Sequence, residues 1–573
     1  MTESYDIVVV GTGWFGLAAS KAIHQISPTA SLLILESASS VGGTWSKNRL
    51  YPGLKSNNMK GTYEFPDFPM DEATYGVGPN NHIPGAVLHR YLTDFAKHFG
   101  FYDNIQFDTA VEGVEKEGDG WKLSVLGSQG SRVIEAKKLV LATGLTSTPN
   151  MPQYKNAEKF DAPLFHAKDF CKEAPNLKVK NAIVVGGAKS AFDVAYALVQ
   201  DGAEVDLIVR PTGNGPVWIA PPFVTPLKKR LDQILNIRWM TWFSPCPWGE
   251  ADGFSSVRNF LHGTSLGRVI VNGFWKALSG DVISANGYDS HPELQKLKPW
   301  HSAFWIGSGL SILNYDTPLF DLVKQGKIRV HIDDIESLEP RRAILASGAV
   351  IDTDAIICST GWKKESTIKL AEEELTLPYS DAKKRALNQA ADAKVLSLYP
   401  GLKSQPDLNI KPKGTDPLRY YRFMVPSRAV RTNNLAFAGM ISTVSTATCA
   451  TIQGHWIAAF LANKIHSIPS SDKEITDEIM LHTQWGKWRY PCGYGADLPD
   501  LVFEGLPYCN MLMRDLGLET QRKGGRFSEL TSPYLPADFR GLVEEWKAKE
   551  EKNWGEISGV GVEVQQVRGY KKD

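Results

Sequence analysis

The chain has 573 residues, of which 43% are hydrophobic and 22% charged, so it is long enough for two or three folded domains with substantial cores. Lys and Arg together number 63, as do Asp and Glu, and this balance provides no bulk attraction for nucleic acid or for an anionic membrane. The composition therefore argues against a disordered chain and against nucleic acid as the main partner.

Cysteine usage and hydropathy indicate the compartment. Six cysteines are scattered without C-x-x-C spacing, which favours reduced, buried thiols over a disulfide framework or a metal site. The first apolar run begins near Tyr5, which leaves no room for a secretory signal. Residues 433–463 carry no Lys, Arg, Asp or Glu, but glycines and polar residues interrupt them, so we expect a buried loop and helix. We therefore expect a cytoplasmic protein with no transmembrane span and no metal, and peripheral membrane contact stays open.

The first predicted strand, residues 6–10, runs directly into three glycines at G-x-G-x-x-G spacing. Gly11 permits a tight turn, Gly13 lets a pyrophosphate approach the main chain, and Gly16 lets the next helix pack against the strand. The second predicted strand ends in Glu36, whose carboxylate is placed to accept hydrogen bonds from the ribose of an adenosine. The complete unit predicts a dinucleotide site, and a glycine-rich turn without a ligand is the alternative.

A second unit of the same kind starts at about residue 181. Gly186, Ala188 and Ala191 occupy its three glycine positions, and alanine at the second position narrows the approach to a pyrophosphate. The partner strand, residues 204–209, ends in Arg210 instead of an acid. A guanidinium at this point pairs with a ribose 2′-phosphate, so the unit predicts NADP rather than NAD. A solvated arginine at a strand end is the alternative.

Two such units predict two dinucleotides and a chain that leaves the first domain and later returns to it. Residues 139–144 and 355–361 each read as a strand that turns on Thr-Gly beside a nucleotide. The predicted fold class is α/β, with two Rossmann-like dinucleotide-binding domains, the NADP domain being inserted in the FAD domain. The predicted boundaries are 1–150 for the first part of the FAD domain, 151–365 for the NADP domain, 366–470 for the return of the FAD domain and 471–573 for a C-terminal extension.

A helical insertion is predicted at about 211–320, and it is rich in tryptophan. Seven of the sixteen tryptophans of the chain fall between Arg210 and Leu319. We favour a subdomain with an aromatic core. The alternatives are a lid over an apolar substrate and a surface that rests on a membrane. In the C-terminal extension, the charged residues 540–552 predict a surface helix.

Further motifs fit the first unit. Residues 41–45 read VGGTW, and residues 54–69 read LKSNNMKGTYEFPDFP. Residues 160–170 follow the pattern F-x-G-x-x-x-H-x-x-x-(F/Y), except that Ala162 replaces the glycine, and residues 451–456 read TIQGHW. Together these motifs resemble the flavin-containing monooxygenases, class B flavoproteins that include the Baeyer–Villiger type, and in particular the branch found in fungal secondary metabolism. The match covers most of residues 5–465.

The resemblance implies an NADPH- and FAD-dependent enzyme that inserts one oxygen atom from O2 into a small organic substrate through a flavin C4a-(hydro)peroxide. It places Asn57 near flavin and nicotinamide. Phe170 and Cys171 end the 160–170 motif differently from typical Baeyer–Villiger enzymes, which favours N- or S-oxygenation. Baeyer–Villiger oxidation or epoxidation is the alternative, a non-catalytic dinucleotide-binding sensor is more remote, and a pyridine nucleotide reductase would need a redox-active cysteine pair.

The motifs and the resemblance together give a set of expected site residues. The expected catalytic residue is Asn57, and the expected cofactor-binding residues are Gly11, Gly13, Trp14, Phe15, Gly16, Glu36, Gly43, Thr44, Trp45, Ser56, Asn58, Val111, Ala142, Thr143, Gly144, Gly186, Gly187, Ala188, Lys189, Ser190, Arg210, Thr360, Gly361, Gly439 and Gln453.

Overall fold

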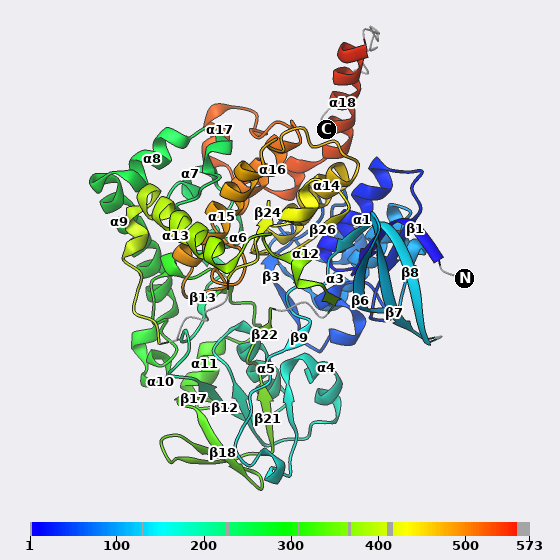
Figure 1. Ribbon diagram of the computed structural model, residues 1–573. Coiled ribbons are helices and arrows are strands. Elements are labelled where there is room, and N and C mark those ends of the chain that lie inside the picture. Colours follow the sequence, from blue (N-terminus) through cyan, green and yellow to red (C-terminus); the bar gives the residue numbers. More distant parts are fainter. Residues whose placement is uncertain are drawn as a thin grey trace.

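A computed structural model shows one mixed sheet with a parallel core, one fully parallel sheet and a helical region beside them (Figure 1). It describes residues 3–128, 130–224, 228–307, 309–364, 368–409 and 416–558, with side chains up to residue 552. The predicted boundary at 365 and 366 lies outside the described residues. In the view of Figure 1, the first sheet lies at the right, the second at the bottom and the helical region at the left.

The first sheet is built around a strand whose second half is buried and which ends at the first glycine turn. Its parallel core consists of β1 (Glu3–Val10), β2 (Leu32–Leu35), β8 (Gly130–Leu141) and β26 (Leu435–Phe437). Val8 and Val9 are fully buried, as an apolar run covered on both faces requires. Because β26 pairs with β8 from nearly 300 residues further along the chain, the chain returns to the first sheet, as predicted.

The second sheet has five strands, and every pair in it is parallel. Its order is β10 (Leu164–His166), β21 (Ala355–Cys358), β11 (Asn181–Val185), β12 (Glu204–Val209) and β17 (Ile328–Ile332). Helix α5 (Lys189–Gln200) follows the second glycine turn, in the same way that α1 (Trp14–Ile26) follows the first. The predicted α/β class with two Rossmann-like units is therefore confirmed.

The segment between β12 and β17 is largely helical and has an aromatic core. It includes α8 (Ser255–Gly263) and α9 (Ser265–Asn286). Trp218, Trp248 and Trp275 are almost fully buried, and the ring of Trp275 meets that of Phe503 edge-on at 4.5 Å. Trp218 and Trp275 pack in one apolar core of this segment, in agreement with the favoured interpretation, whereas Trp248 packs against Trp485 in the core that contains the first sheet. Within the described ranges, no helix combines the length and the apolar character needed to cross a bilayer.

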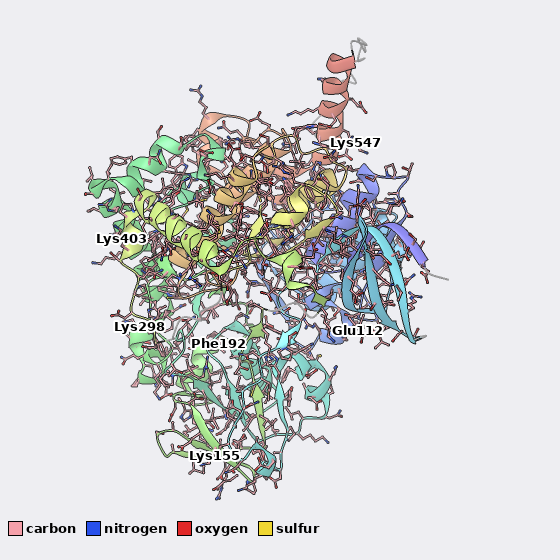
Figure 2. The ribbon with its side chains drawn as sticks, in the orientation of Figure 1. Glu112, Lys155, Phe192, Lys298, Lys403 and Lys547 are labelled. Atoms are coloured by element: carbon pink, nitrogen blue, oxygen red, sulfur yellow. The ribbon has the colours of Figure 1, made fainter. Side chains whose placement is uncertain are left out.

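The C-terminal residues pack on both the first sheet's helices and the helical region. Helix α14 (Thr446–Leu461) lies against α1 and contacts α16 (Gly505–Asp515). Helix α18 (Leu542–Ser558) starts at the predicted place but is not simply a surface helix, because Leu542 and Trp546 are buried. Its Lys547, labelled in Figure 2, donates to the carbonyl of Gln25 at 2.8 Å.

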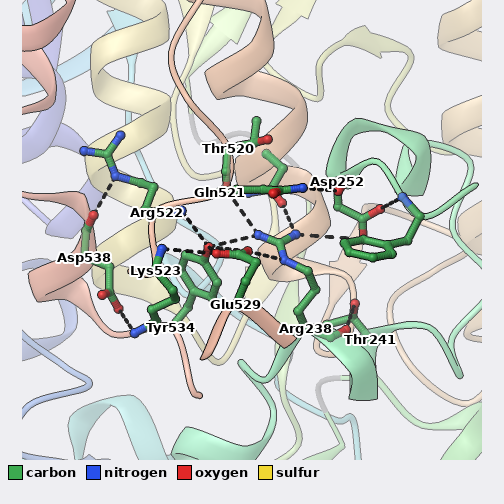
Figure 3. A network of polar contacts seen from close by, with 12 residues as sticks. Arg238, Thr241, Asp252, Thr520, Gln521, Arg522, Lys523, Glu529, Tyr534 and Asp538 are labelled. Atoms are coloured by element: carbon green, nitrogen blue, oxygen red, sulfur yellow. Dashed lines mark hydrogen bonds and ion pairs between the residues drawn. The ribbon is translucent and has the colours of Figure 1, made fainter. Parts of the chain in front are cut away.

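A buried polar network joins the helical region to the C-terminal residues (Figure 3). Arg238, only 1% exposed, donates through Nε to Glu529 (2.5 Å), through one terminal nitrogen to Asn510 (2.7 Å) and through the other to the hydroxyl of Tyr534 (3.1 Å). Each of the three nitrogens of this guanidinium thus has a hydrogen-bond partner from residues 510–534. The two regions are consequently one packed unit.

Candidate active site

A first cavity of about 640 Å³ opens at the carboxyl ends of β1 and β8, where the first glycine turn lies. Gly11 has a φ of 108°, and a Cβ at this position would collide with the carbonyl of Ala142. The second glycine turn of this region faces the first, since a Cβ on Gly43 would lie 3.1 Å from Cα of Gly13. Bare main chain on both sides fits a pyrophosphate, which needs close approach to backbone N–H groups.

Glu36 lines this cavity directly after β2. Its carboxylate accepts hydrogen bonds from the backbone N–H (2.9 Å) and the hydroxyl (2.7 Å) of Thr12 and from the backbone N–H of Ala38 (2.8 Å). These three donors fix its orientation, and one lone pair, which the Ser37 hydroxyl approaches only at 3.4 Å, is left for a ribose hydroxyl. The residues present therefore fit an adenine dinucleotide.

Most residues expected around the first dinucleotide line the first cavity. They are Gly11, Gly13, Trp14, Phe15, Glu36, Gly43, Thr44, Val111, Ala142, Thr143, Gly144 and Gly439. Gly16 lies outside the lining and instead lets α1 pack closely on the turn at Gly11. Gln453 also lies outside it. The Gln453 side chain is fully buried behind Gly439, accepting from the Gly439 N–H (3.0 Å) and donating to the Tyr508 hydroxyl (2.7 Å).

A second cavity of about 470 Å³ lies at the second glycine turn. Gly186 has a φ of 145°, and a Cβ on Gly187 would lie 2.9 Å from the carbonyl of Gly215. The hydroxyl of Ser359, buried in the lining, has no hydrogen-bond partner among the residues that the structure describes, and such an orphaned group fits a polar ligand. The expected residues that line this cavity are Gly186, Gly187, Ala188, Ser190, Arg210, Thr360 and Gly361.

Three residues line both cavities and therefore form their common wall: Thr44, Arg49 and Lys168. Burial lowers the pKa of Arg49, and burial together with the charge of Arg49 lowers the pKa of Lys168. Two neighbouring cations that are partly desolvated favour an anion between them, such as a cofactor phosphate. Sequence reasoning missed Arg49 and Lys168, because neither belongs to a glycine motif.

His166 also lines the second cavity, and its ring is fully engaged. Its Nδ1 accepts from the backbone N–H of Lys168 (3.1 Å), so Nε2 carries the proton and donates to the carbonyl of Gly361 (3.0 Å). Burial lowers the pKa of His166, which favours this neutral form. His166 is a satisfied histidine at the edge of the second sheet.

A third cavity of about 370 Å³ contains Asn57. It shares Tyr63, Ser442, Thr443 and Thr446 with the first cavity, so the two adjoin. Its walls include the apolar side chains Leu231, Leu235, Leu310, Ile312, Val444 and Val502. Four residues expected at the cofactors line this cavity, and not the first or second: Trp45, Ser56, Asn58 and Lys189; Ser190 lines both the second and the third.

The structure also brings together two cysteines that the sequence gives no reason to pair. Sγ of Cys449 and Sγ of Cys509 are 3.6 Å apart and buried, one on α14 and the other on α16. The two residues are 60 positions apart, so spacing gave no signal. Neither lines any of the three cavities, so the pair is not placed as a reductase dithiol would be.

Comparison with known proteins agrees with this geometry. Residues 8–239 match the pyridine nucleotide-disulphide oxidoreductase family. An FAD-dependent monooxygenase of Aspergillus nomiae is 33% identical, with 95% of this chain and 98% of the relative covered, and one of Aspergillus sclerotiorum is 31% identical over 96% and 99%. The solved structure of ε-caprolactone-bound cyclohexanone monooxygenase has the same fold, with a TM-score of 0.57, 16% identity and coverage of 90% of this chain and 98% of that one.

The near-complete coverage at more than 30% identity, together with the two nucleotide cavities, settles the family. FAD is therefore a cofactor of the protein. The chain belongs to the FAD-dependent monooxygenases of the flavin-containing monooxygenase family.

Proposed function

We propose that this enzyme uses NADPH and FAD to insert one atom of O2 into a small organic substrate, with N- or S-oxygenation favoured. FAD binds in the first cavity, NADPH in the second and the substrate in the third. The single observation that carries this proposal is the contiguity of the three cavities. The first and second share the wall of Thr44, Arg49 and Lys168, and the first and third share Tyr63.

When bound, the flavin supplies oxygen activation and the nicotinamide supplies hydride. The protein contributes binding, orientation and exclusion of water. The glycine turns bind phosphates through bare backbone, and Arg49 and Lys168 balance their charge. The amide of Asn57 offers both donors and an acceptor in the third cavity, which adjoins the first, and the apolar side chains of the third cavity help to exclude water from the reacting atoms.

The charged groups of the third cavity support a neutral substrate. Asp232 is paired with Arg230 at 2.7 Å, and Lys189 is paired with Asp193. With these charges compensated, the cavity offers apolar side chains beside neutral hydroxyl and amide groups, which suit a neutral sulfide or an unprotonated amine. A substrate lone pair then accepts oxygen directly, so no acid and base pair is needed. Baeyer–Villiger oxidation or epoxidation of a neutral substrate is the alternative.

The setting of the reaction follows from the relatives. The curated relatives named above come from fungi, and we propose a secondary-metabolite intermediate as the substrate and the cytoplasm as the compartment.

The purified enzyme tests this function. We expect a yellow protein whose flavin absorbance bleaches when NADPH is added under argon and returns when air is admitted. Neutral sulfides, amines, ketones and alkenes are then screened by mass for the gain of one oxygen atom. Products from sulfides or amines support the proposal, and products only from ketones or alkenes favour the alternative. A colourless protein, or one that NADPH does not bleach, contradicts the function and favours a dinucleotide sensor.

A further inference from the structure

The strand that carries Asn57 is held from outside its own sheet. This strand, β3 (Lys55–Met59), pairs only with the three-residue strand β4 (His82–Pro84) within the described residues. A short two-stranded ribbon is weak by itself and needs other contacts to hold it in place. Those contacts come from residues of the second dinucleotide unit and of the helical region.

The first set of contacts is made by Asn314, which follows the strand β16 (Leu310–Ile312). Its side-chain nitrogen donates to the carbonyls of Lys55 (3.2 Å) and Ser56 (3.1 Å), the two residues directly before Asn57. Asn314 is only 9% exposed, so these bonds are shielded from water. The amide oxygen of Asn314 has a different partner, Nζ of Lys189, at 2.9 Å.

Lys189 is the first residue of α5, directly after the glycine turn of the second cavity. Its side chain is 13% exposed, forms an ion pair with Asp193 and lies over the ring of Tyr315, 4.5 Å from the ring centre. The hydroxyl of Tyr315 donates to the same carboxylate of Asp193 at 2.9 Å. This arrangement directs the ammonium group toward β3, and Lys189 is not among the residues that line the second cavity.

The other end of β3 is held as well. The backbone N–H of Met59 donates to Asp232 (3.0 Å), which is buried and paired with Arg230. The side chain of Asn58 donates to the carbonyl of Val444 (3.1 Å). Asn57 is therefore the residue of the strand whose neighbours on both sides are fixed while its own side chain lines the cavity.

We propose that Lys189 and Asn314 are positioning residues that connect the NADPH-binding turn to Asn57. Any displacement of the start of α5 is passed through the ammonium group of Lys189 to Asn314, and through Asn314 to the two carbonyls that precede Asn57. The position of Asn57 at the flavin thus depends on the position of the second dinucleotide unit. This inference rests on the function proposed for Asn57, and it replaces the expectation that Lys189 binds the cofactor.

The test compares Lys189→Met with the conservative Lys189→Arg, which keeps a donor for Asn314. The control is Lys298→Met, because Lys298, labelled in Figure 2, also pairs with an aspartate but lies at the outer surface. In the absence of substrate every NADPH oxidised yields one hydrogen peroxide, and we expect Lys189→Met to release peroxide about fivefold faster than the unmodified enzyme. Bound FAD should be unchanged, and the dissociation constant of NADP⁺, measured by calorimetry, should stay within about twofold. Lys189→Arg should return the rate of peroxide release most of the way to that of the unmodified enzyme, and Lys298→Met should leave this rate unchanged.

Hydrogen exchange gives a readout that does not depend on turnover. We expect faster exchange of the backbone amides of residues 55–59 in Lys189→Met and in Asn314→Ala than in the unmodified chain, and no change in Lys298→Met. Unchanged exchange at 55–59 in both variants overturns the inference. A large loss of NADP⁺ affinity in Lys189→Met with an unchanged rate of peroxide release also overturns the inference, because Lys189 would then contact the cofactor itself.

A double variant separates this inference from the function of Asn57. If Lys189 acts through Asn57, Asn57→Leu with Lys189→Met releases no more peroxide than Asn57→Leu alone. Additive effects contradict the connection while leaving the role of Asn57 intact. If Asn57→Leu by itself leaves the rate of peroxide release unchanged, the proposed role of Asn57 fails. An effect of Lys189→Met in that case has another cause.

Discussion

The backbone N–H of Gly439 donates to the side-chain oxygen of Gln453 at 3.0 Å, and this bond joins the returning part of the chain to helix α14 behind the first cavity. Gly439 lines the cavity with a φ of 79°, while Gln453 is fully buried and lies outside the lining. Gln453 therefore supports the wall of the first cavity at Gly439 without lining the cavity itself.

Replacement of Gln453 by leucine leaves the N–H of Gly439 buried without a partner. We expect Gln453→Leu to release FAD about tenfold more readily, since an unsatisfied buried group costs about 1 to 3 kcal/mol. The dissociation constant of FAD, measured by fluorescence after removal of the cofactor, checks this. Gln405→Leu is the control, because the side chain of Gln405 donates to the backbone carbonyl of Trp488 (2.9 Å) and lines none of the three cavities. Equal retention in both variants would contradict the role of Gln453.

Arg210 is the residue that we expect to distinguish NADPH from NADH. It lies at the end of β12 in the lining of the second cavity, where a 2′-phosphate is expected. We expect Arg210→Ala to raise the KM for NADPH about 10- to 100-fold and to change the KM for NADH by less than about twofold. Lys155→Ala, at an exposed position at the lower edge of Figure 2, serves as the control. Equal losses for both cofactors would remove Arg210 from the phosphate site.

Lys168 lies on the wall common to the first two cavities. Because burial and the charge of Arg49 already lower its pKa, loss of its charge relieves repulsion in the free protein and removes attraction for a phosphate. Lys168→Met should therefore unfold at a similar or slightly higher urea concentration but bind NADP⁺ about tenfold more weakly in calorimetry. Unchanged NADP⁺ binding would show that Lys168 has only a structural role.

Arg238 connects the helical region with the C-terminal residues. Arg238→Met leaves the buried carboxylate of Glu529 without its cationic partner, which costs about 3 to 5 kcal/mol of unfolding free energy. Adding Glu529→Gln should recover part of this loss, since the uncompensated charge is then gone. Urea unfolding checks both variants, with Arg342→Met at an exposed ion pair as a control that should leave the transition unchanged. A loss in Arg342→Met as large as that in Arg238→Met would contradict the account.

His455 predicts a pH dependence of stability. It is buried under α18, neither ring nitrogen has a hydrogen-bond partner among the described residues, and burial, followed by the charge of Lys21, lowers its pKa to about 3. In the unfolded chain the pKa is near 6.5, so below that pH the unfolded state binds the proton and folding loses stability until about pH 3.

His455→Leu removes this pH-dependent contribution to the unfolding free energy. Its unfolding free energy relative to the unmodified protein should rise as the pH falls from 6.5 to 4, by at most about 1.4 kcal/mol per pH unit, and should be constant above pH 7. Urea unfolding at a series of pH values measures the difference. A difference that does not vary with pH would show that His455 is not buried in its neutral form.

The two dinucleotide units were predictable because their signals are local. Gly11 and Gly186 each follow a buried strand within one turn, and their positive φ angles and close backbone contacts are consequences of neighbouring residues. The acid at Glu36 and the cation at Arg210 are fixed by the ends of short parallel strands. Such units have a fixed register, so sequence position translates directly into spatial position.

The rest of the site depends on contacts between distant segments. Arg49 and Lys168 meet at one wall although more than 100 residues separate them, and Asn314 reaches Ser56 across 258 residues. The motif residues Lys189 and Gln453 are expected at the cofactors from the sequence, but their side chains point to other protein groups. Side-chain direction is set by tertiary packing, which a motif does not encode.

The stoichiometry of bound cofactors shows whether one chain binds FAD and NADP⁺ at two separate sites. The enzyme is denatured to count released FAD by absorbance, and calorimetry counts the NADP⁺ that binds to the intact holoenzyme. We predict one FAD and one NADP⁺ for each chain, with NADP⁺ binding weakened by Arg210→Ala and FAD content unchanged. A single dinucleotide per chain, or NADP⁺ that competes with FAD for one site, would contradict the account.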